Sequence, residues 1–252
     1  MIDDRNVYTN SYKIESYLCD EDDRLSLWGL SRLMQTVAEE HTILTHISYF
    51  DLIAKDKAWV LSRMYYVIER MPAYGEVVQF STWSRGNDGL FNARDYRVFD
   101  HEGNVLATAS AYWVVIDFTA RRVCRLDSIM EGYVHHTECA TDKQRLAKLR
   151  LQPFADADKV DSFKVKPSML DHTRHVNNSE YVKWIDDLRP DGTAVCDLEI
   201  DFLAETRRGE EVAVYRQKAE DGGKWQYRID NNRGVSITAQ IGVVAADVRE
   251  DS

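Results

Sequence analysis

Residues 94–113 read RDYRVFDHEGNVLATASAYW, and residues 224–243 read KWQYRIDNNRGVSITAQIGV. In both stretches an alternating apolar segment leads into a glycine-containing turn and then into a second alternating segment, which is the pattern of a β-hairpin. Gly103 of the first turn and Gly234 of the second stand 131 positions apart (234 − 103). One hairpin pattern in each half of the chain predicts an internal duplication.

A second pair of segments extends the duplication in the same order. Gly75-Glu76 and Gly209-Glu210 stand 134 positions apart (209 − 75), and each pair precedes a run of alternating apolar residues. Such a run predicts a half-buried strand. The repeat therefore covers more than the two hairpins.

One helix is predicted upstream of each set of strands. In the first half, apolar residues at helical spacing predict a helix over Leu27–His41, with Ser26 as its N-cap. In the second half the helix starts after Asn177 or Asn178, and Asn177 with Glu180 has the spacing of a capping box. Each half thus contains a strand, one long helix and several antiparallel strands, which predicts an α+β fold in which each antiparallel sheet wraps around its helix.

The strand pattern is interrupted in the middle of the chain. We expect an N-terminal domain over residues 1–127, a linker over residues 128–160 and a C-terminal domain over residues 161–252. The sequence DKQRLAKLRLQ, residues 142–152, predicts a short helix inside this linker.

Composition excludes several classes of protein. The net charge is −10 and there is no long block of Lys and Arg, which argues against a nucleic-acid partner. No apolar stretch is long enough to span a membrane and the N-terminus lacks a signal-peptide pattern, so a cytoplasmic protein is expected. The four cysteines occur without CxxC pairs, so we expect reduced thiols and neither a metal site nor a cofactor: Cys19, Cys124, Cys139 and Cys196.

Residues 170–187, LDHTRHVNNSEYVKWIDD, contain the candidate site. Asp171, Thr173 and His175 alternate along an extended or turning segment, so their side chains are expected on one face. A histidine exchanges a proton near neutral pH, a carboxylate orients it, and the N–H groups of a following helix hold developing negative charge. This combination suits attack on a carbonyl. The alternative, a solvated turn beside a helix cap, remains open from these residues alone.

The duplication points to the same residues. Arg24 of the first half occupies the place of His175, 151 positions earlier (175 − 24), and Met71 occupies the place of Glu205, 134 positions earlier (205 − 71). The fold therefore does not itself require the histidine or the glutamate. Residues that differ between two copies of one fold are candidates for function.

Glu205 has two interpretations. Buried beside a sheet without a partner, its carboxylate would lose hydration, which is the condition of a useful general acid or base. Paired with Arg207 or Arg208, it would be a structural ion pair. The local sequence leaves both interpretations open.

Four segments of the chain carry a resemblance to a known family. They are LSLWGLSRLMQTVAEEH (residues 25–41), WVLSRMYYVIERMPAYGEVVQFSTW (59–83), ASAYWVVIDFTARRVCRL (109–126) and HVNNSEYVKW (175–184). With them the chain resembles the acyl-acyl-carrier-protein (acyl-ACP) thioesterases of plants and bacteria over almost its whole length. The resemblance implies two tandem hot-dog domains, the first binding the acyl chain and the second catalytic.

The resemblance also implies the site residues. Asp171 and His175 take the ends of the family's D-x-N-x-H run, and Glu205 takes the place of its glutamate. Thr173 stands where the family has asparagine, and Thr206 stands where many plant members have cysteine, so a covalent cysteine route has no support. In the implied mechanism Glu205, helped by Thr173, activates a water that attacks the thioester. His175 and the helix N–H groups hold the oxyanion, and Asp171 orients its neighbours.

The implied reaction is hydrolysis of fatty acyl-ACP to free fatty acid and ACP, without a cofactor. The partner is then acyl carrier protein with its phosphopantetheine-linked acyl chain, and hot-dog sheets also often pair, as in a homodimer. Because that carrier is acidic, two basic groups are candidates for its docking: Arg121, Arg122 and Arg125, and Lys143, Arg145, Lys148 and Arg150. Two alternatives stay open. One is a thioesterase for acyl-CoA, and the other is a catalytically weak or silent acyl-binding protein, because Thr173 replaces the asparagine.

Overall fold

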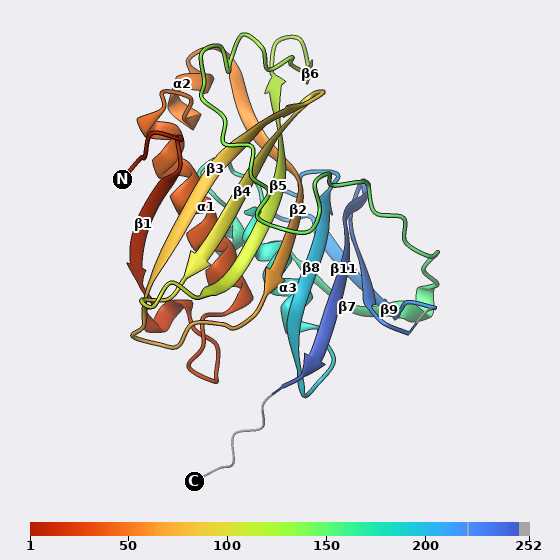
Figure 1. Ribbon diagram of the computed structural model, residues 1–252. Helices are drawn as coiled ribbons and strands as arrows, with labels where there is room; N and C mark the ends of the chain where they lie inside the picture. The colour runs from red at the N-terminus through yellow and green to blue at the C-terminus, as the bar shows by residue number, and fades with distance from the viewer. Residues whose placement is uncertain (221, 247–252) are drawn as a thin grey trace. The chain divides into compact units, whose positions relative to one another are not determined.

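The computed structural model describes residues 1–220 and 222–246 (Figure 1). The chain divides into two compact units, Met1–Leu146 and Ala147–Ser252, which we call unit 1 and unit 2. Each unit contains a set of antiparallel strands.

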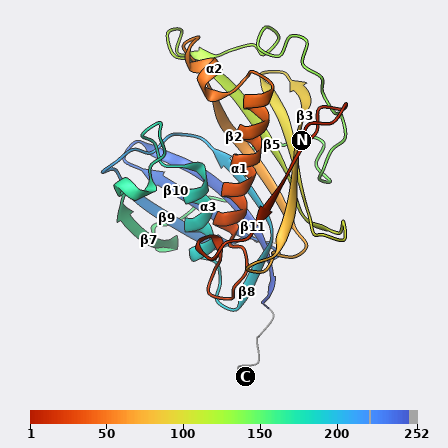
Figure 2. The ribbon, with the colours of Figure 1, turned by 90° about the vertical axis from the view of Figure 1, so that its left-hand side faces the viewer.

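Unit 1 contains two helices, a 3-10 turn and six strands. In chain order they are β1 (Tyr8–Lys13), η1 (Ser16–Leu18), α1 (Leu27–Leu44), α2 (Tyr49–Ile53), β2 (Lys57–Ile68), β3 (Val77–Asp88), β4 (Phe91–Phe99), β5 (Val105–Asp117) and β6 (Arg122–Val123). The strand order in the sheet is β1-β3-β4-β5-β2, with the short β6 paired to β5. Figure 2 shows α1 lying along one face of this sheet.

Helix α1 forms where the sequence predicts it. The Ser26 side chain accepts a hydrogen bond from the Gly29 N–H, which caps the helix, and the helix runs on three residues past His41 to Leu44. Its apolar stripe is buried, including Leu30, Met34 and Val37 at 0% exposure. Each fully buried side chain of this size contributes roughly 1.5–3 kcal/mol. The stripe therefore fixes which face of α1 meets the sheet.

The described residues of unit 2 form one α-helix, two 3-10 turns and five strands. In chain order they are η2 (Asp156–Asp158), β7 (Lys159–Lys164), η3 (Pro167–Met169), α3 (Asn178–Asp187), β8 (Thr193–Phe202), β9 (Glu211–Lys218), β10 (Trp225–Asn231) and β11 (Gly234–Ala245). The strand order is β8-β11-β10-β9-β7. Rings of α3 pack on rings of the sheet, with Trp184 4.8 Å from Phe163 and Tyr181 6.3 Å from Phe202 between centroids.

Helix α3 begins at the predicted place but is capped differently. Asn177 is the N-cap, and its side-chain oxygen accepts from the N–H and the hydroxyl of Ser179, at 2.9 and 2.7 Å. The predicted capping box with Glu180 is not the arrangement found, because Ser179 offers two donors one residue earlier. The helix has 10 residues, against 18 in α1.

The backbones of the two units repeat each other at the predicted positions. The hairpins β4–β5 and β10–β11 form as expected. Gly75 and Gly209 adopt φ values of +80° and +81°, a region that favours glycine. The Gly75 N–H donates to the Ile14 carbonyl at 2.8 Å, and the Gly209 N–H donates to the Val165 carbonyl at 3.1 Å. The duplication is therefore a repeat of hydrogen bonding as well as of sequence.

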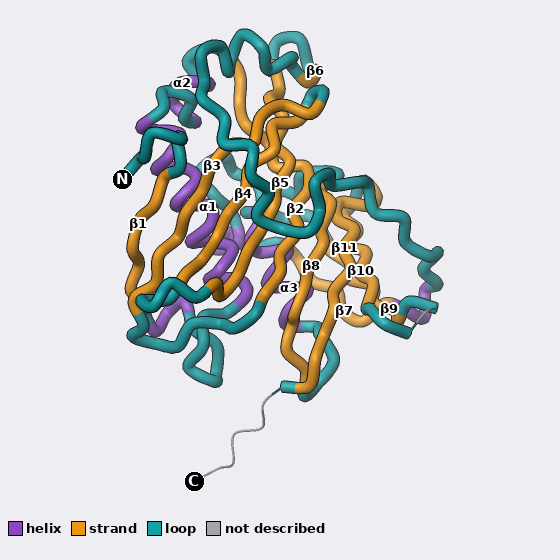
Figure 3. The backbone as a smooth tube through the Cα atoms, in the orientation of Figure 1, coloured by secondary structure: helices purple, strands orange, loops and turns teal. Residues whose placement is uncertain are grey.

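The helix predicted over residues 142–152 is absent, although this whole segment lies in the described part of the chain (Figure 3). Arginine side chains donate hydrogen bonds to carbonyl oxygens that, in a helix, would accept from backbone N–H groups. Arg85 donates to the Gln144 carbonyl at 3.0 Å and Arg63 to the Leu146 carbonyl at 2.6 Å. Leu146 is 3% exposed, so the segment is held in an irregular conformation by its side chain and by its backbone.

His41 lies buried in unit 1 beside a buried cation. The Arg94 guanidinium donates to His41 Nδ1 at 3.1 Å, so the ring is neutral and its Nε2–H faces the Asn6 side-chain oxygen at 3.1 Å. Burial, and then the charge of Arg94, lower the pKa of His41 to about 3. In the folded protein this histidine therefore stays neutral at pH values at which the same histidine in the unfolded chain, with a pKa of about 6.5, is protonated.

This difference predicts a pH dependence of stability. As the pH falls from about 6.5 toward 3, the unfolded state binds a proton at His41 first, so the folded state loses a contribution on the order of a few kcal/mol. His41→Gln removes this dependence. The free energy of unfolding from urea titrations at pH 7.5 and pH 4.5 should differ less in the variant than in the parent. His101→Gln, at a side chain that is 80% exposed, is the control and should keep the parental difference.

Candidate active site

The segment before α3 folds into a tight loop. The Asp171 N–H donates to the His175 carbonyl at 2.9 Å, and the Arg174 N–H donates to the Asp171 carbonyl at 3.0 Å. Arg174 takes the left-handed backbone conformation, at φ +67°. Asp171 Oδ1 also accepts from the Thr173 N–H at 2.8 Å. These bonds bring Asp171, Thr173 and His175 together as the alternation of the sequence predicts.

A second segment lies against this loop. The Val176 N–H donates to the Thr206 carbonyl at 2.9 Å, and His175 and Arg207 form an antiparallel bridge. The second segment is the connection between β8 and β9, which carries Glu205. Backbone pairing thus places Glu205 beside His175, although the two residues are 30 positions apart (205 − 175).

The four predicted side chains form one chain of polar contacts. The Thr173 hydroxyl donates to Asp171 Oδ1 at 2.5 Å and lies 3.3 Å from His175 Nδ1. His175 Nε2 lies 3.1 Å from Glu205 Oε2. The order along the chain of contacts is carboxylate, hydroxyl, imidazole, carboxylate.

Counting protons assigns the roles in this chain. The Thr173 hydroxyl has one proton, which the short contact to Asp171 uses, so its oxygen accepts from His175 Nδ1–H. The remaining contact joins His175 Nε2 to Glu205 Oε2 at 3.1 Å. Asp171 therefore orients the imidazole through Thr173, and Glu205 faces its other nitrogen.

Glu205 is exposed, so of its two interpretations the buried carboxylate is not the one found. Its side chain is 46% exposed. The chain leaves β8 at a bulge where the N–H groups of Leu203 and Ala204 both donate to the Ser236 carbonyl, and the next residue projects beyond the sheet. Glu205 also lies 3.9 Å from the Arg207 guanidinium, so the alternative ion pair is present alongside the contact to His175.

Unit 1 contains the same backbone arrangement without the imidazole and the glutamate, although Asp20 takes the place of Asp171, 151 positions earlier (171 − 20). The Leu25 N–H donates to the Pro72 carbonyl at 2.8 Å, and Arg24 and Ala73 form the antiparallel bridge. Arg24 is thus the counterpart of His175, and Met71 precedes Pro72 as Glu205 precedes Thr206. The arrangement is part of the fold, and the imidazole and carboxylate are additions in unit 2.

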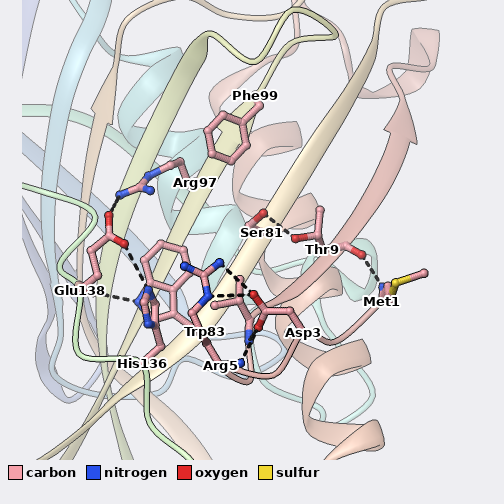
Figure 4. Close-up of a pocket in the computed structure, with 11 residues that line it drawn as sticks. Met1, Asp3, Arg5, Thr9, Ser81, Trp83, Arg97, Phe99, His136 and Glu138 are labelled. Atoms are coloured by element: carbon pink, nitrogen blue, oxygen red, sulfur yellow. Dashed lines mark hydrogen bonds and ion pairs between the residues drawn. The ribbon is translucent and has the colours of Figure 1, made fainter.

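A cavity of about 340 Å³ lies on unit 1, away from these counterparts (Figure 4). Its charged groups pair with one another. Arg97 lies 2.8 Å from Glu138, Arg5 lies 2.9 Å from Asp3, and the His136 ring lies 3.2 Å from Glu138. None of the predicted site residues lines it.

In the part of the chain that the structure describes, no group of three or more His, Cys, Asp and Glu is placed to hold a metal ion. Within the same residues, no helix has both the length and the apolar character to cross a membrane. The four cysteines are free thiols.

Two family models match the chain. The Acyl-ACP thioesterase N-terminal domain matches residues 5–133, and the Acyl-ACP thioesterase C-terminal domain matches residues 154–243. Among curated relatives, the chloroplastic palmitoyl-acyl carrier protein thioesterase of Gossypium hirsutum is 29% identical over 201 residues, which are 73% of this chain and 48% of that protein. The chain therefore spans about half the length of this relative.

Solved structures share the fold. The oleoyl thioesterase (putative) from Lactobacillus plantarum has a TM-score of 0.85 at 21% identity, covering 96% of this chain and 97% of that one. The 12:0-ACP thioesterase from Umbellularia californica has a TM-score of 0.83 at 20% identity, covering 95% and 98%. The fold is thus a hot-dog-like α+β fold, with a histidine and carboxylates gathered before a helix. The chain belongs to the acyl-ACP thioesterase family.

The role of Thr173 can be tested on the ring that it contacts. Thr173→Val keeps the shape and removes the hydroxyl, so His175 Nδ1–H loses its acceptor at a cost of about 1 kcal/mol. The ¹⁵N resonances of the His175 ring should shift in a histidine-selective NMR spectrum. Thr36→Val, at an exposed position of α1, is the control. Parental ring resonances in Thr173→Val would contradict the proposed chain of contacts.

Proposed function

We propose that the protein hydrolyses the thioester of a fatty acyl-acyl carrier protein, releasing the free fatty acid and the carrier. The observation that carries the proposal is the 3.1 Å contact between His175 Nε2 and Glu205 Oε2 at the start of α3. Membership of the acyl-ACP thioesterase family supports the same reaction. Asp171 and Thr173 then serve to hold the histidine ring.

The proposed reaction has two steps. Glu205 takes a proton from a water molecule, whose oxygen attacks the thioester carbonyl carbon. The resulting oxyanion is stabilised by the N–H groups at the positive end of α3 and by His175. The tetrahedral intermediate then collapses, the C–S bond breaks, and the thiolate of the carrier arm takes the proton back from Glu205.

The contacts of Thr173 favour hydrolysis over the alternative of a catalytically silent acyl-binding protein. Its hydroxyl makes both contacts that link Asp171 to the ring, at 2.5 and 3.3 Å, with one donated and one accepted hydrogen bond. An asparagine amide would offer the same two functions from a longer side chain. The substitution therefore leaves the orientation of His175 intact.

We further propose that the two units are tandem hot-dog domains. Residues 1–127 form the domain that binds the acyl chain, residues 128–160 the linker, and residues 161–252 the catalytic domain. The repeated backbone bonds support two copies of one fold, and the histidine and glutamate in unit 2 alone support the division of labour.

For docking of the acidic carrier we favour the basic group at Arg121, Arg122 and Arg125. Members of the other group are engaged within unit 1. The Lys143 ammonium lies 4.1 Å from the centre of the Tyr65 ring, and Arg145 lies 3.4 Å from Asp88. Arg121 and Arg122 are exposed, and Arg125, which lies 3.1 Å from Asp127, is 85% exposed.

Substitution of the two reacting groups tests the function. Glu205→Gln removes the base and His175→Ala removes the imidazole, so each should lower thiol release from acyl-ACP by about 10²–10⁴-fold. The melting temperature should change little, since both side chains are partly exposed. The measurement is release of free thiol from acyl-ACPs of graded chain length, with matched acyl-CoAs run in parallel.

Unit 1 supplies matched controls for this experiment. Arg24→Ala and Met71→Gln change the counterparts of His175 and Glu205 on the same backbone and should leave turnover within about twofold. If both Glu205→Gln and His175→Ala turn over acyl-ACP at the parental rate, the assignment of the site is wrong. Faster turnover of acyl-CoA than of acyl-ACP would show that the carrier is coenzyme A and not acyl carrier protein.

A further inference from the structure

The backbone of Glu205 is held by a residue that the proposed reaction does not use. Asn231 ends β10 and is 8% exposed. Its side-chain nitrogen lies 3.1 Å from the Glu205 carbonyl oxygen and 3.1 Å from the Thr206 hydroxyl oxygen. Both contacts are made to the connection between β8 and β9. At Glu205 and Thr206 this connection is not part of a strand.

The orientation of the Asn231 amide is defined by its other end. Its side-chain oxygen accepts from the Arg233 N–H at 2.9 Å, within the turn of the β10–β11 hairpin. The NH₂ group must therefore face Glu205 and Thr206. The Arg233 guanidinium also donates to the Glu205 carbonyl, so the hairpin supplies two donors to this one oxygen.

Thr206 connects this support to the histidine. It is 0% exposed, its hydroxyl accepts from Asn231, and its carbonyl accepts from the Val176 N–H at 2.9 Å. Asn231 thus bonds to the segment that is paired with the backbone next to His175. A shift of this segment would change the separation between Glu205 Oε2 and His175 Nε2.

Unit 1 shows that the hairpin itself does not need the NH₂ group. Asp100 stands 131 positions before Asn231 (231 − 100), and its carboxylate accepts from the Glu102 N–H at 2.9 Å, as Asn231 does from Arg233. A carboxylate has no N–H to donate, so Asp100 cannot hold the carbonyl of Met71, the counterpart of Glu205. In unit 1 both oxygens of Asp100 serve the turn, since Oδ2 accepts from the Asn104 side-chain nitrogen at 2.8 Å. In unit 2 the Asn231 oxygen accepts within the turn, and the Asn231 nitrogen faces Glu205 and Thr206.

We propose that Asn231 is a positioning residue of the thioesterase site. Its NH₂ group fixes the backbone of Glu205 and Thr206 and thereby the contact between Glu205 and His175. It touches none of the reacting atoms. The inference rests on the proposed function, in which Glu205 is the base.

The test is Asn231→Asp, which is nearly isosteric and keeps the acceptor of the turn. Asp100 shows that a carboxylate fits such a hairpin, so the variant should fold. It loses both donors and sets a negative oxygen against the Glu205 carbonyl. A misplacement of about 1 Å at a reacting group can cost on the order of 100-fold, so kcat for thiol release should fall about 10- to 100-fold, with KM within twofold. The matched control is Asp100→Asn in unit 1, which should keep the parental kcat.

A second readout does not depend on activity. Release of Glu205 should change the ¹⁵N resonances of the His175 ring in Asn231→Asp and leave them unchanged in Asp100→Asn. Parental kcat or parental ring resonances in Asn231→Asp overturn the proposal, as does a loss of rate that vanishes when expressed per folded molecule. If the parent releases no thiol from any acyl-ACP or acyl-CoA, the proposed function fails, and the ring resonances still decide the role of Asn231.

Discussion

The hydrogen bond from the Val176 N–H to the Thr206 carbonyl is the constraint on which the site depends. It joins the segment before α3 to the connection after β8. His175 directly precedes Val176 and Glu205 directly precedes Thr206, so this bond brings the two site residues close together. The same bond joins Leu25 to Pro72 in unit 1. A backbone bond is indifferent to the side chains around it, so one scaffold can carry Arg24 in one copy and His175 in the other.

What distinguishes the two copies is therefore a small set of side chains on a shared backbone. Unit 2 has an imidazole between two carboxylates, with Thr173 as the link on one side. Because the Thr173 hydroxyl both donates and accepts, it transmits the position of Asp171 to the ring. The departure from the family asparagine is thus compatible with an oriented histidine.

Prediction from sequence worked where the deciding forces are local. The Ser26 cap, the apolar stripe of α1 and the strands that follow Gly75-Glu76 and Gly209-Glu210 depend on residues close in the sequence, and these features formed as predicted. The helix over residues 142–152 was wrong because Arg63 and Arg85, more than 50 residues away, occupy carbonyls of that segment. The local sequence could not choose between a buried and a paired Glu205, because the bulge at which Leu203 and Ala204 both donate to the Ser236 carbonyl joins residues more than 30 positions apart.

The sequence by itself predicted the repeated pattern, the starts of α1 and α3, and Asp171, Thr173, His175 and Glu205 as candidate site residues. Spacing and periodicity carry this information because helices and hairpins are short-range structures. Only the tertiary structure decided that Glu205 is exposed and that Asn231 holds its backbone. Those facts depend on hydrogen bonds between residues 26 or more positions apart, and no local pattern records which distant donor meets a given carbonyl.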